Sequence, residues 1–413
     1  MAKTRTERNA VQRASQPNKR LIMLNRGKDP QDNPAVSTEN KLGEYNYYSY
    51  FENNDFPDIL VNARELSPTN GGIIERKAQL VKGKRLKVVA DNPEHQPMVD
   101  RITEGVDEGN GLHNMLFALA SDYFTFGGYC IEPITSQGVL TSFAHQDWTM
   151  IRRGWIEAKN EDGEIQRIEG YLIGPYWCTT DSKETKAHKE QVQWFNGYTY
   201  GVSTDKKSLI YRMRYTQRKQ YYPLPDYISC LKSARTEIEL INFKNNNTVN
   251  SFNPSGVLVL PDEIDDTEVQ AIQNQVQSDL IGTNNAGNVL IVRTRDGGVV
   301  NFTPFANSPT NKDVTAYETS AREEMVIAHQ IPSLTVIGMQ GGASLGGDGN
   351  TLDTSYRILN ELVIEPVRDM ILADFKKLYR DMGYAITFEV ENFRIDDSSA
   401  KVDKVGNETN IEE

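Results

Sequence analysis

The sequence predicts an α+β fold, with a strand-rich region in the N-terminal half and helices that recur from Pro223 onward. Three observations support this prediction. Between Tyr129 and Tyr215 the chain is rich in Tyr, Trp and Thr and carries turn pairs such as Asp162–Gly163, as twisted antiparallel sheets with hairpins do. From Pro223 onward, apolar residues recur at helical spacing. The length of 413 residues, 38% of them hydrophobic, favours two or three domains or one interrupted domain.

The N-terminal half is expected to begin with a flexible basic arm, residues 1–45, which has no sustained apolar period. A short helix over residues 73–81 and a strand at Leu86–Val89 follow. The clearest helical spacing is that of Leu112, Met115, Leu116, Leu119 and Tyr123. The pair Gly127–Gly128 ends this helix, and the strand-rich region starts there.

The C-terminal half is expected to alternate helices with short strands. Three helices are predicted, at Ile228–Ile241, Asp262–Leu280 and Lys312–Gln330. Pro332 ends the third, because the residue before a proline is pushed out of the helical region. The predicted strands are Gly256–Leu260, Val289–Thr294 and Val299–Phe305. The last two flank Asp296-Gly297-Gly298, which predicts a β-hairpin between two helices of similar length.

A glycine-rich loop and a long helix complete the chain. Residues 338–349 read GMQGGASLGGDG, with six glycines. The apolar spacing from Thr351 to Met382 then predicts a long helix, which Pro366 should kink. A final strand is expected at Ala385–Phe393, before an acidic tail over residues 396–413.

Charge is distributed unevenly along the chain. The net charge is −12, while residues 1–28 carry eight basic side chains against Glu7, a net of 8 − 1 = +7, which leaves −12 − 7 = −19 for the rest. A basic arm on an acidic body fits a nucleic-acid contact, an acidic neighbouring subunit or a solvated arm. An acidic body argues against tight gripping of DNA. It is compatible with DNA sliding past.

The cysteines and apolar runs indicate an intracellular origin. Cys130, Cys178 and Cys230 lie far apart and are odd in number, so neither a disulfide framework nor a metal site is expected. The chain has no run of 18 apolar residues, so we expect no transmembrane helix, and the polar N-terminus does not resemble a secretory signal.

The sequence contains no recognisable catalytic or cofactor-binding motif. The glycine-rich loop lacks the lysine of a phosphate-binding loop, since none lies between Lys312 and Lys376, and Leu352 breaks the dinucleotide pattern. Five scattered histidines lack zinc-ligand spacing: His95, His113, His145, His188 and His329. His329 is expected in the last turn of its helix, where a cation complements the helix dipole. No enzyme activity, metal or cofactor is therefore expected.

From about Gly71 to Phe388 the sequence resembles the portal protein family of tailed double-stranded DNA phages. The order and spacing of five stretches carry the resemblance. They are LHNMLFALASDYFTFGGYCIEPI (112–134), YYPLPDYISCLKSARTEIELINFKNNNTVNSFNPSGVLVLP (221–261), GTNNAGNVLIV (282–292), AREEMVIAHQIPSLTVIG (321–338) and NELVIEPVRDMILADFKKL (360–378). The long glycine loop, the basic arm and the short C-terminus depart from the family pattern.

The resemblance implies the portal fold: a β-rich wing, a two-helix stem, a β-hairpin clip, a tunnel loop, and a long kinked helix leading to a small crown. The implied boundaries are wing 46–261, stem helices 262–280 and 310–331, clip 281–309, tunnel loop 332–349, tunnel and crown 350–395 and tail 396–413. Subunits of this family form a ring, usually of twelve, at one capsid vertex. The ring is a channel for double-stranded DNA during packaging and ejection.

The resemblance also implies partners and site residues. The partners are the packaging terminase, the head–tail adaptor, and the major capsid or scaffold protein. The implied channel residues of the tunnel loop are Met339, Gln340, Gly341, Gly342, Ser344, Gly346, Gly347 and Asp348. The implied docking residues of the clip are Asn284, Asn285, Arg293, Arg295 and Asp296. A different connector or adaptor ring protein is an alternative, and a nucleotide-dependent enzyme using the glycine loop is a more distant one.

Elementary physics gives these assignments a rationale. Helices 266–280 and 312–330 have narrow apolar stripes, which neighbouring subunits would complete. The loop 338–349 contains no Lys or Arg, so it would touch DNA weakly and release it. Arg293 and Arg295 would lie on one face of a strand, toward DNA, an acidic adaptor or a neighbouring clip.

Overall fold

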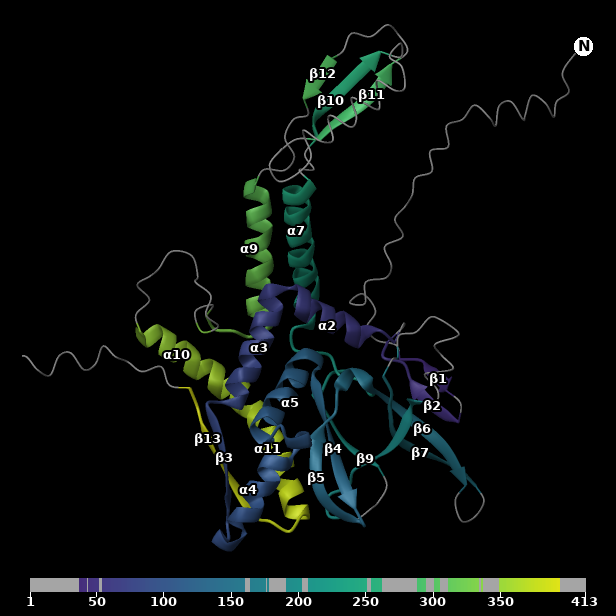
Figure 1. Cartoon of the computed structure of the whole chain (residues 1–413), viewed down its shortest axis with the longest axis vertical. Coiled ribbons are helices and arrows are strands. Elements are labelled where there is room, and N and C mark those ends of the chain that lie inside the picture. Colours follow the sequence, from purple (N-terminus) through teal and green to yellow (C-terminus); the bar gives the residue numbers. More distant parts are fainter. Residues whose placement is uncertain are drawn as a thin grey trace, which may run out of the picture. The chain divides into compact units, whose positions relative to one another are not determined.

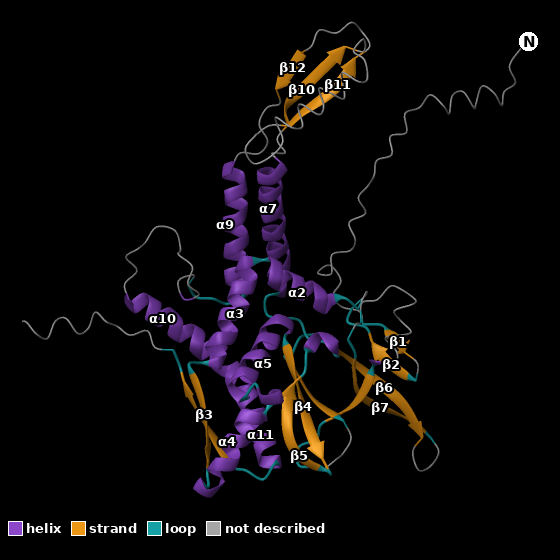
Figure 2. Ribbon diagram, viewed as in Figure 1, coloured by secondary structure: helices purple, strands orange, loops and turns teal. Residues whose placement is uncertain are grey.

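The computed structural model contains helices and three sheets, so the predicted α+β class is confirmed (Figure 1). Figure 2 shows strands β4–β7 to one side of the helices α3, α5 and α11. The structure describes residues 37–42, 44–51, 54–159, 164–175, 177, 191–202, 207–250, 254–261, 288–294, 301–304, 311–333, 336 and 349–393.

The largest sheet runs through the N-terminal half. Its eight strands are β1 (Glu39–Leu42), β2 (Tyr45–Tyr48), β4 (Gly128–Ser136), β5 (Val139–His145), β6 (Ile151–Lys159), β7 (Ile165–Ile173), β8 (Gln193–Gly197) and β9 (Ser208–Met213). The strand order is β1-β2-β6-β7-β8-β9-β4-β5, and each neighbouring pair is antiparallel except β8–β9. The expected antiparallel sheet is therefore present, with one parallel pair. The expectation of a flexible arm over residues 1–45 is wrong for β1, whose backbone pairs with β2.

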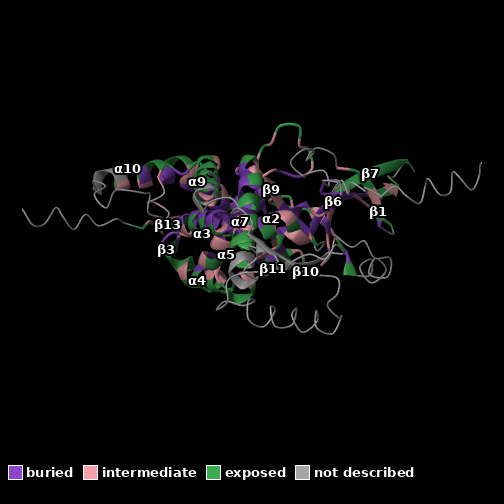
Figure 3. Cartoon of the chain, turned by 90° about the horizontal axis from the view of Figure 1, so that it is seen from above, coloured by how far each residue is buried: buried purple, intermediate pink, exposed green. Residues whose placement is uncertain are grey.

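Helices beside this sheet share a core with it. They are α2 (Phe56–Leu66), α3 (Pro68–Lys82), α4 (Gln96–Gly105) and α5 (Leu112–Phe126), with 3₁₀ turns at Pro93–His95, Asp107–Gly109, Trp148–Met150 and Ile228–Cys230. Ile74 of α3, Leu116 of α5 and Tyr129 of β4 are fully buried in one cluster. The first residues of β7 are exposed, as Figure 3 shows, so the sheet extends beyond this core.

The end of α5 follows the predicted glycine signal. Gly127 has a φ of +87°, a left-handed conformation in which an L side chain is strained. A Cβ at this position would also lie 2.7 Å from the carbonyl oxygen of Leu224. The residue that stops the helix must therefore be glycine for two independent reasons.

The long C-terminal helix is interrupted rather than uniform. It consists of α10 (Gly349–Leu359), a π-helical stretch (Asn360–Ile364) and α11 (Glu365–Asp381). The N–H of Glu365 bonds the carbonyl of Asn360, five residues back. Pro366 follows directly and has no N–H with which to bond the carbonyl of Leu362. The irregular stretch thus lies where the proline removes a helical hydrogen bond, and the kink itself stays a prediction.

A two-stranded sheet pairs β13 (Ile386–Glu391), the last strand of the described chain, with β3 (Arg85–Ala90), which follows α3. Beside it, Arg368 of α11 donates hydrogen bonds to the carbonyls of Leu80 and Val81, at 2.5 and 2.8 Å. These carbonyls belong to the last turn of α3, which has no intrahelical partners for them. Arg368 therefore ties the C-terminal helix to the end of α3.

Three further strands form a separate sheet between two helices in the chain. The helices are α7 (Leu231–Asn250) and α9 (Asn311–Ala328), and the strands are β10 (Pro254–Pro261), β11 (Asn288–Thr294) and β12 (Asn301–Pro304). The order is β11-β10-β12, with β10–β11 parallel and β10–β12 antiparallel.

The predicted hairpin between the second and third of these strands is wrong. Each pairs with β10, and the two do not pair with each other. The reason is topological: β10 lies between the two strands, parallel to β11 and antiparallel to β12, and so separates them. The sequence analysis placed β10 in the wing, but its hydrogen bonds join it to the strands expected in the clip.

Candidate functional site

The helices α7 and α9 lie side by side and antiparallel (Figure 1). Lys244 of α7 forms an ion pair with Glu318 of α9, and Ser233 donates a 2.5 Å hydrogen bond to Glu324. Between these polar contacts, the small side chains of Ala234 and Ala321 are buried. The helix that pairs with α9 is thus α7, which the sequence analysis assigned to the wing. The expected first stem helix, 262–280, lies outside the described residues.

A buried carboxylate anchors α7 to the start of α3. Glu237 accepts hydrogen bonds from the hydroxyl of Thr69 at 2.6 Å, from the Thr69 N–H at 3.2 Å, and from the Ser67 hydroxyl. Ser67 is itself the N-cap of α3, accepting from the N–H of Asn70. A negative charge at a helix N-terminus is stabilised by the helix dipole and by the unpaired N–H groups there. These contacts hold the base of α7 on α3.

A second buried group anchors the end of α9. Lys77 of α3 is fully buried and forms a 2.6 Å ion pair with Asp226. His329, just after α9, is also fully buried, with its Nε2 2.8 Å from the Oδ1 of Asn70. Its ring stacks on that of Tyr227, with centroids 4.8 Å apart. We call Lys77, Asp226, His329, Asn70 and Tyr227 the basal cluster.

Charge in the basal cluster is set by burial and by Lys77. Burial raises the pKa of the Asp226 carboxyl, but the charge and hydrogen bond of Lys77, together with other basic groups nearby, hold that pKa below its usual value. Burial, together with the Lys77 charge, lowers the pKa of His329 to about 3. His329 is therefore neutral near pH 7. The expectation of a cation that complements the helix dipole is wrong, because a protonated ring here would be desolvated beside an ammonium group.

A third polar group fastens α11 to the large sheet. Asp374 is buried and accepts hydrogen bonds from the hydroxyls of Tyr129 and Tyr200, each at 2.9 Å. Arg212 of β9 donates two more, both at 2.7 Å. Burial raises the pKa of Asp374, but the Arg212 hydrogen bonds and charge bring it below its usual value. The carboxylate thus joins strands β4 and β9 to the C-terminal helix.

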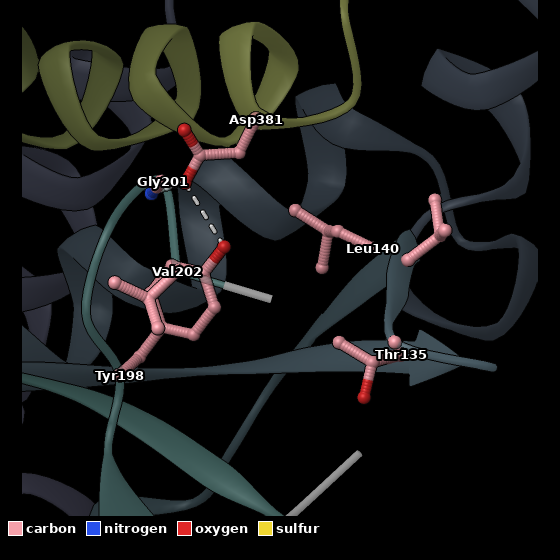
Figure 4. A pocket seen from close by; sticks show the side chains of 8 residues that line it. Thr135, Leu140, Tyr198, Gly201, Val202 and Asp381 are labelled. Carbon is pink, nitrogen blue, oxygen red and sulfur yellow. Dashed lines mark hydrogen bonds between the residues drawn. The ribbon is translucent and has the colours of Figure 1, made fainter. Parts of the chain in front are cut away.

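A small cavity lies next to the end of α11 (Figure 4). Its volume is about 230 Å³, and Thr135, Leu140 and Val202 contribute to its lining. Asp381 accepts from the Tyr198 hydroxyl at 3.0 Å and from the Gly201 N–H at 2.9 Å. Its carboxylate is thus engaged in holding the loop, and the cavity brings no nucleophile and base together.

The buried polar contacts of the described residues join elements that lie far apart in the chain. In the described part of the chain, no three His, Cys, Asp or Glu residues gather in a way that could hold a metal ion. Over the same residues, no helix has the length and apolarity to cross a membrane. Cys130 and Cys230 are buried free thiols, and Cys178 lies outside the described residues. The feature that stands out is therefore the anchored helix pair.

Most of the residues predicted to line a channel lie outside the described residues. This holds for the whole set in the loop 338–348 and for Asn284, Asn285, Arg295 and Asp296. Arg293 lies in β11, opposite Leu260 of β10. Glu237 and the basal cluster were not predicted, because a single sequence gives little indication of whether a charge is buried. For Lys77 the one available signal was its apolar neighbours, Ala78 and Leu80.

Comparison with known proteins gives no match by sequence: no family model and no curated protein matches this chain. Solved structures do match. A chain in the neck of the empty gene transfer agent (GTA) particle, computed with C6 symmetry, shares 14% identity and a TM-score of 0.52, over 84% of this chain and 86% of that one. A chain in the neck of the native GTA particle, computed with C12 symmetry, shares 13% identity and a TM-score of 0.50, over 80% and 83%.

These similarities show the class of fold: that of a chain in the neck of a gene transfer agent particle. An HK97 family phage portal protein from Corynebacterium diphtheriae also matches, with 13% identity, over 79% of this chain and 94% of that one. Its TM-score of 0.38 is too low to support an argument by itself. At these identities the comparisons concern the fold alone.

Proposed function

We propose that this protein is the portal subunit of a tailed phage or phage-like particle. The observation that carries the proposal is a fold shared, over 80% of the chain, with a neck chain in a particle computed with C12 symmetry. The sequence resemblance between Gly71 and Phe388 supports it independently, because it rests on the order of motifs rather than on coordinates.

In this proposal twelve copies form a ring at one capsid vertex. The paired helices α7 and α9 form the stem, and the β10–β12 sheet forms the clip. The eight-stranded sheet belongs to the wing, and α10 and α11 lead toward a small crown. Head-to-tail interfaces that close by rotation generate such a ring. The anchoring of α7 and α9 by Glu237 and His329 would keep the stem rigid relative to the wing.

The ring would act as a channel without chemistry of its own. The loop 338–349 contains no Lys or Arg, and its one charge is Asp348. Since each phosphate contact by Lys or Arg adds salt-dependent affinity, a wall without them lets DNA move in either direction. Packaging then requires a separate ATPase, the terminase, which docks at the clip and is later replaced by the head–tail adaptor. The protein itself would need no cofactor.

Its location follows from this role. The ring would assemble in the bacterial cytoplasm, with scaffold and major capsid protein, and would remain in the virion. The basic arm, +7 over residues 1–28, would contact DNA or an acidic neighbour.

Electron microscopy of the purified full chain tests the proposal. Negative-stain images should show rings with a central hole, and native mass spectrometry should give twelve times the subunit mass of 46.7 kDa. A monodisperse monomer at micromolar concentration would refute the ring. ATP binding on filters together with ATP hydrolysis would instead favour a nucleotide-dependent enzyme.

A further inference from the structure

Each helix of the α7–α9 pair carries an exposed stripe on the side that faces away from the other helix. Ala234 of α7, with Ala321 and Met325 of α9, is buried and marks the inner sides of the pair. On the opposite sides, exposed residues follow one another at intervals of three or four, so each set forms one stripe along its helix. The α7 stripe is Lys232, Arg235, Glu239 and Phe243, and the α9 stripe is Ala316, Thr319, Glu323 and Ile327.

Both stripes leave apolar surface in water. Ile327 is 76% exposed and Phe243 is 42% exposed. Rotating either helix to hide these side chains would break the Ser233–Glu324 hydrogen bond and expose the buried inner sides. A second molecule that covers the stripes removes the same apolar surface from water and leaves the helix pair intact.

The apolar member of the α7 stripe lies level with a small residue of the α9 stripe. The Ser233–Glu324 hydrogen bond sets the register of the antiparallel pair, and each residue along a helix adds about 1.5 Å. Counting from this bond places Phe243 within about 3 Å of the height of Ala316. A large ring and a small side chain at one height are complementary in shape, as in packed helix interfaces.

The charges of the two stripes are also complementary at one height. Glu323 lies between the heights of Lys232 and Arg235, within about 3 Å of each. Ile327 lies about 3 Å below Lys232, whose methylene stem can cover it while the ammonium group reaches Glu323. One stripe therefore presents two bases where the other presents an acid.

The remaining polar groups on these sides are compatible with this match. Glu239 lies within about 2 Å of the height of Thr319, a small uncharged residue. Arg322 has the height of Arg235, but it projects about a quarter of a turn away from the α9 stripe. Like charges are thus kept apart, and Arg322 is opposite in charge to Glu239.

We propose that the α7 stripe of one subunit packs against the α9 stripe of the next copy around the ring. This inference rests on the proposed function and names the faces that join neighbouring stems. The occupant is a second copy, because the stripes complement each other but lie on opposite sides of one helix pair and cannot meet within a subunit. Rotation about an axis along the stem preserves height, so it brings Phe243 to Ala316 and Glu323 to Arg235. The interface is heterologous, as a closed ring of more than two copies requires.

Charge reversal in two separate variants tests the contact. Glu323→Arg and Arg235→Glu should each raise the subunit concentration at which rings dissociate by about tenfold or more. Sedimentation and native mass spectrometry measure this concentration, and circular dichroism checks folding. Glu104→Arg, at an exposed position of α4, is the matched control and should leave the ring unchanged. Rings of the stripe variants as stable as wild type would overturn the inference, as would an equal loss in the control.

Mixing the two variants distinguishes a contact between copies from a contact within one subunit. In an equimolar mixture of Glu323→Arg and Arg235→Glu subunits, an alternating ring has opposite charges at every interface. Native mass spectrometry should therefore show rings that contain equal numbers of the two subunits, at concentrations where neither variant forms rings alone. A mixture as unstable as the separate variants would contradict the proposed contact.

Cross-linking locates the contact at its upper end. A short bis-maleimide should convert the double variant Phe243→Cys/Ala316→Cys into a ladder of covalent multimers. The single variants control for the native cysteines. A cross-link confined to single subunits would contradict packing between copies. Failure of the wild type to form rings refutes the proposed function, whereas wild-type rings that the stripe variants match in stability refute this contact alone.

Discussion

At the residue scale, buried charged side chains join elements that lie far apart in the sequence. Lys77 reaches Asp226, Glu237 reaches Thr69, and Arg212 reaches Asp374. Because a buried charge is costly without a partner, each pair tolerates only one arrangement of its elements. These contacts therefore fix how the elements are placed against one another, in addition to stabilising the fold.

His329 should make the stability of the subunit depend on pH. Its pKa is 6.5 when unfolded and about 3 when folded, so the unfolded chain binds the extra proton as pH falls. The free energy of unfolding is unaffected above pH 6.5 and decreases below it, by about 1.4 kcal/mol for each pH unit. Urea unfolding should show a loss of about 2 kcal/mol between pH 6.5 and pH 5 from this group.

The variant His329→Gln provides the control, because the amide can still bond Asn70 but does not titrate over this range. Its unfolding free energy should change less between pH 6.5 and pH 5 than that of the wild type. Identical pH profiles would show that His329 is not the titrating group. Asp226 also lowers the free energy of unfolding as pH falls, but only at lower pH, since its pKa lies below its usual value of 3.8.

Replacing Asp374 should weaken the attachment of α11. Asp374→Asn removes the charge that Arg212 neutralises and leaves the hydroxyls of Tyr129 and Tyr200 with a poorer acceptor. We expect a loss of about 2–3 kcal/mol in unfolding free energy, since Arg212 can still reach water. Asp369→Asn, on the exposed side of the same helix, should change it by less than about 0.5 kcal/mol. Equal losses of unfolding free energy for the two substitutions would show that Asp374 does not attach α11 to the sheet.

At the element scale, the ends and interruptions of helices are determined by single residues. Gly127 ends α5, Ser67 caps α3, and Pro366 follows the π-helical stretch that divides the C-terminal helix. Local sequence rules identified Gly127 and Pro366, because each acts through its own backbone: the glycine adopts a left-handed conformation and the proline lacks an N–H. The partner of Arg368, the last turn of α3, depends on tertiary packing and has no local signal.

A pair of glycine substitutions tests this view of helix ends. Gly127→Ala must adopt φ +87° and places a Cβ 2.7 Å from the Leu224 carbonyl, so we expect a loss of about 2 kcal/mol or more. Gly105→Ala, at the end of α4 with open space around it, should be neutral or gain about 0.5 kcal/mol. Chemical denaturation compares the two variants. A tolerated Gly127→Ala would mean that the turn can change its conformation.

At the scale of the whole molecule, the proposed ring has two kinds of surface with opposite requirements. Contacts between copies must be durable, whereas the channel wall must release DNA. In this proposal, the absence of Lys and Arg from the loop around Ser344 answers the second requirement.

Measurements of DNA packaging test whether the channel wall must release DNA. Ser344→Lys would place one added positive charge per subunit in the loop, and we expect DNA packaging to slow several-fold and to recover partly as salt is raised. Ser344→Gln, similar in length but uncharged, should package at the wild-type rate. An unchanged velocity for the lysine variant would mean that this loop does not face DNA.

The sequence by itself determined the features that depend on local periodicity. The helix ending at Gly127, the helix starting near Lys312 and the strand-rich region after Tyr129 were all predictable, because each is encoded within a few consecutive turns or strand repeats. Tertiary structure alone decided which elements meet. β10 pairs with β11 although residues 262–287 separate them in the chain, and His329 is neutral because it is buried and a lysine from α3 lies near it. The pairing of strands and the desolvation of a side chain depend on residues that are distant in the chain, so a local sequence pattern cannot predict them.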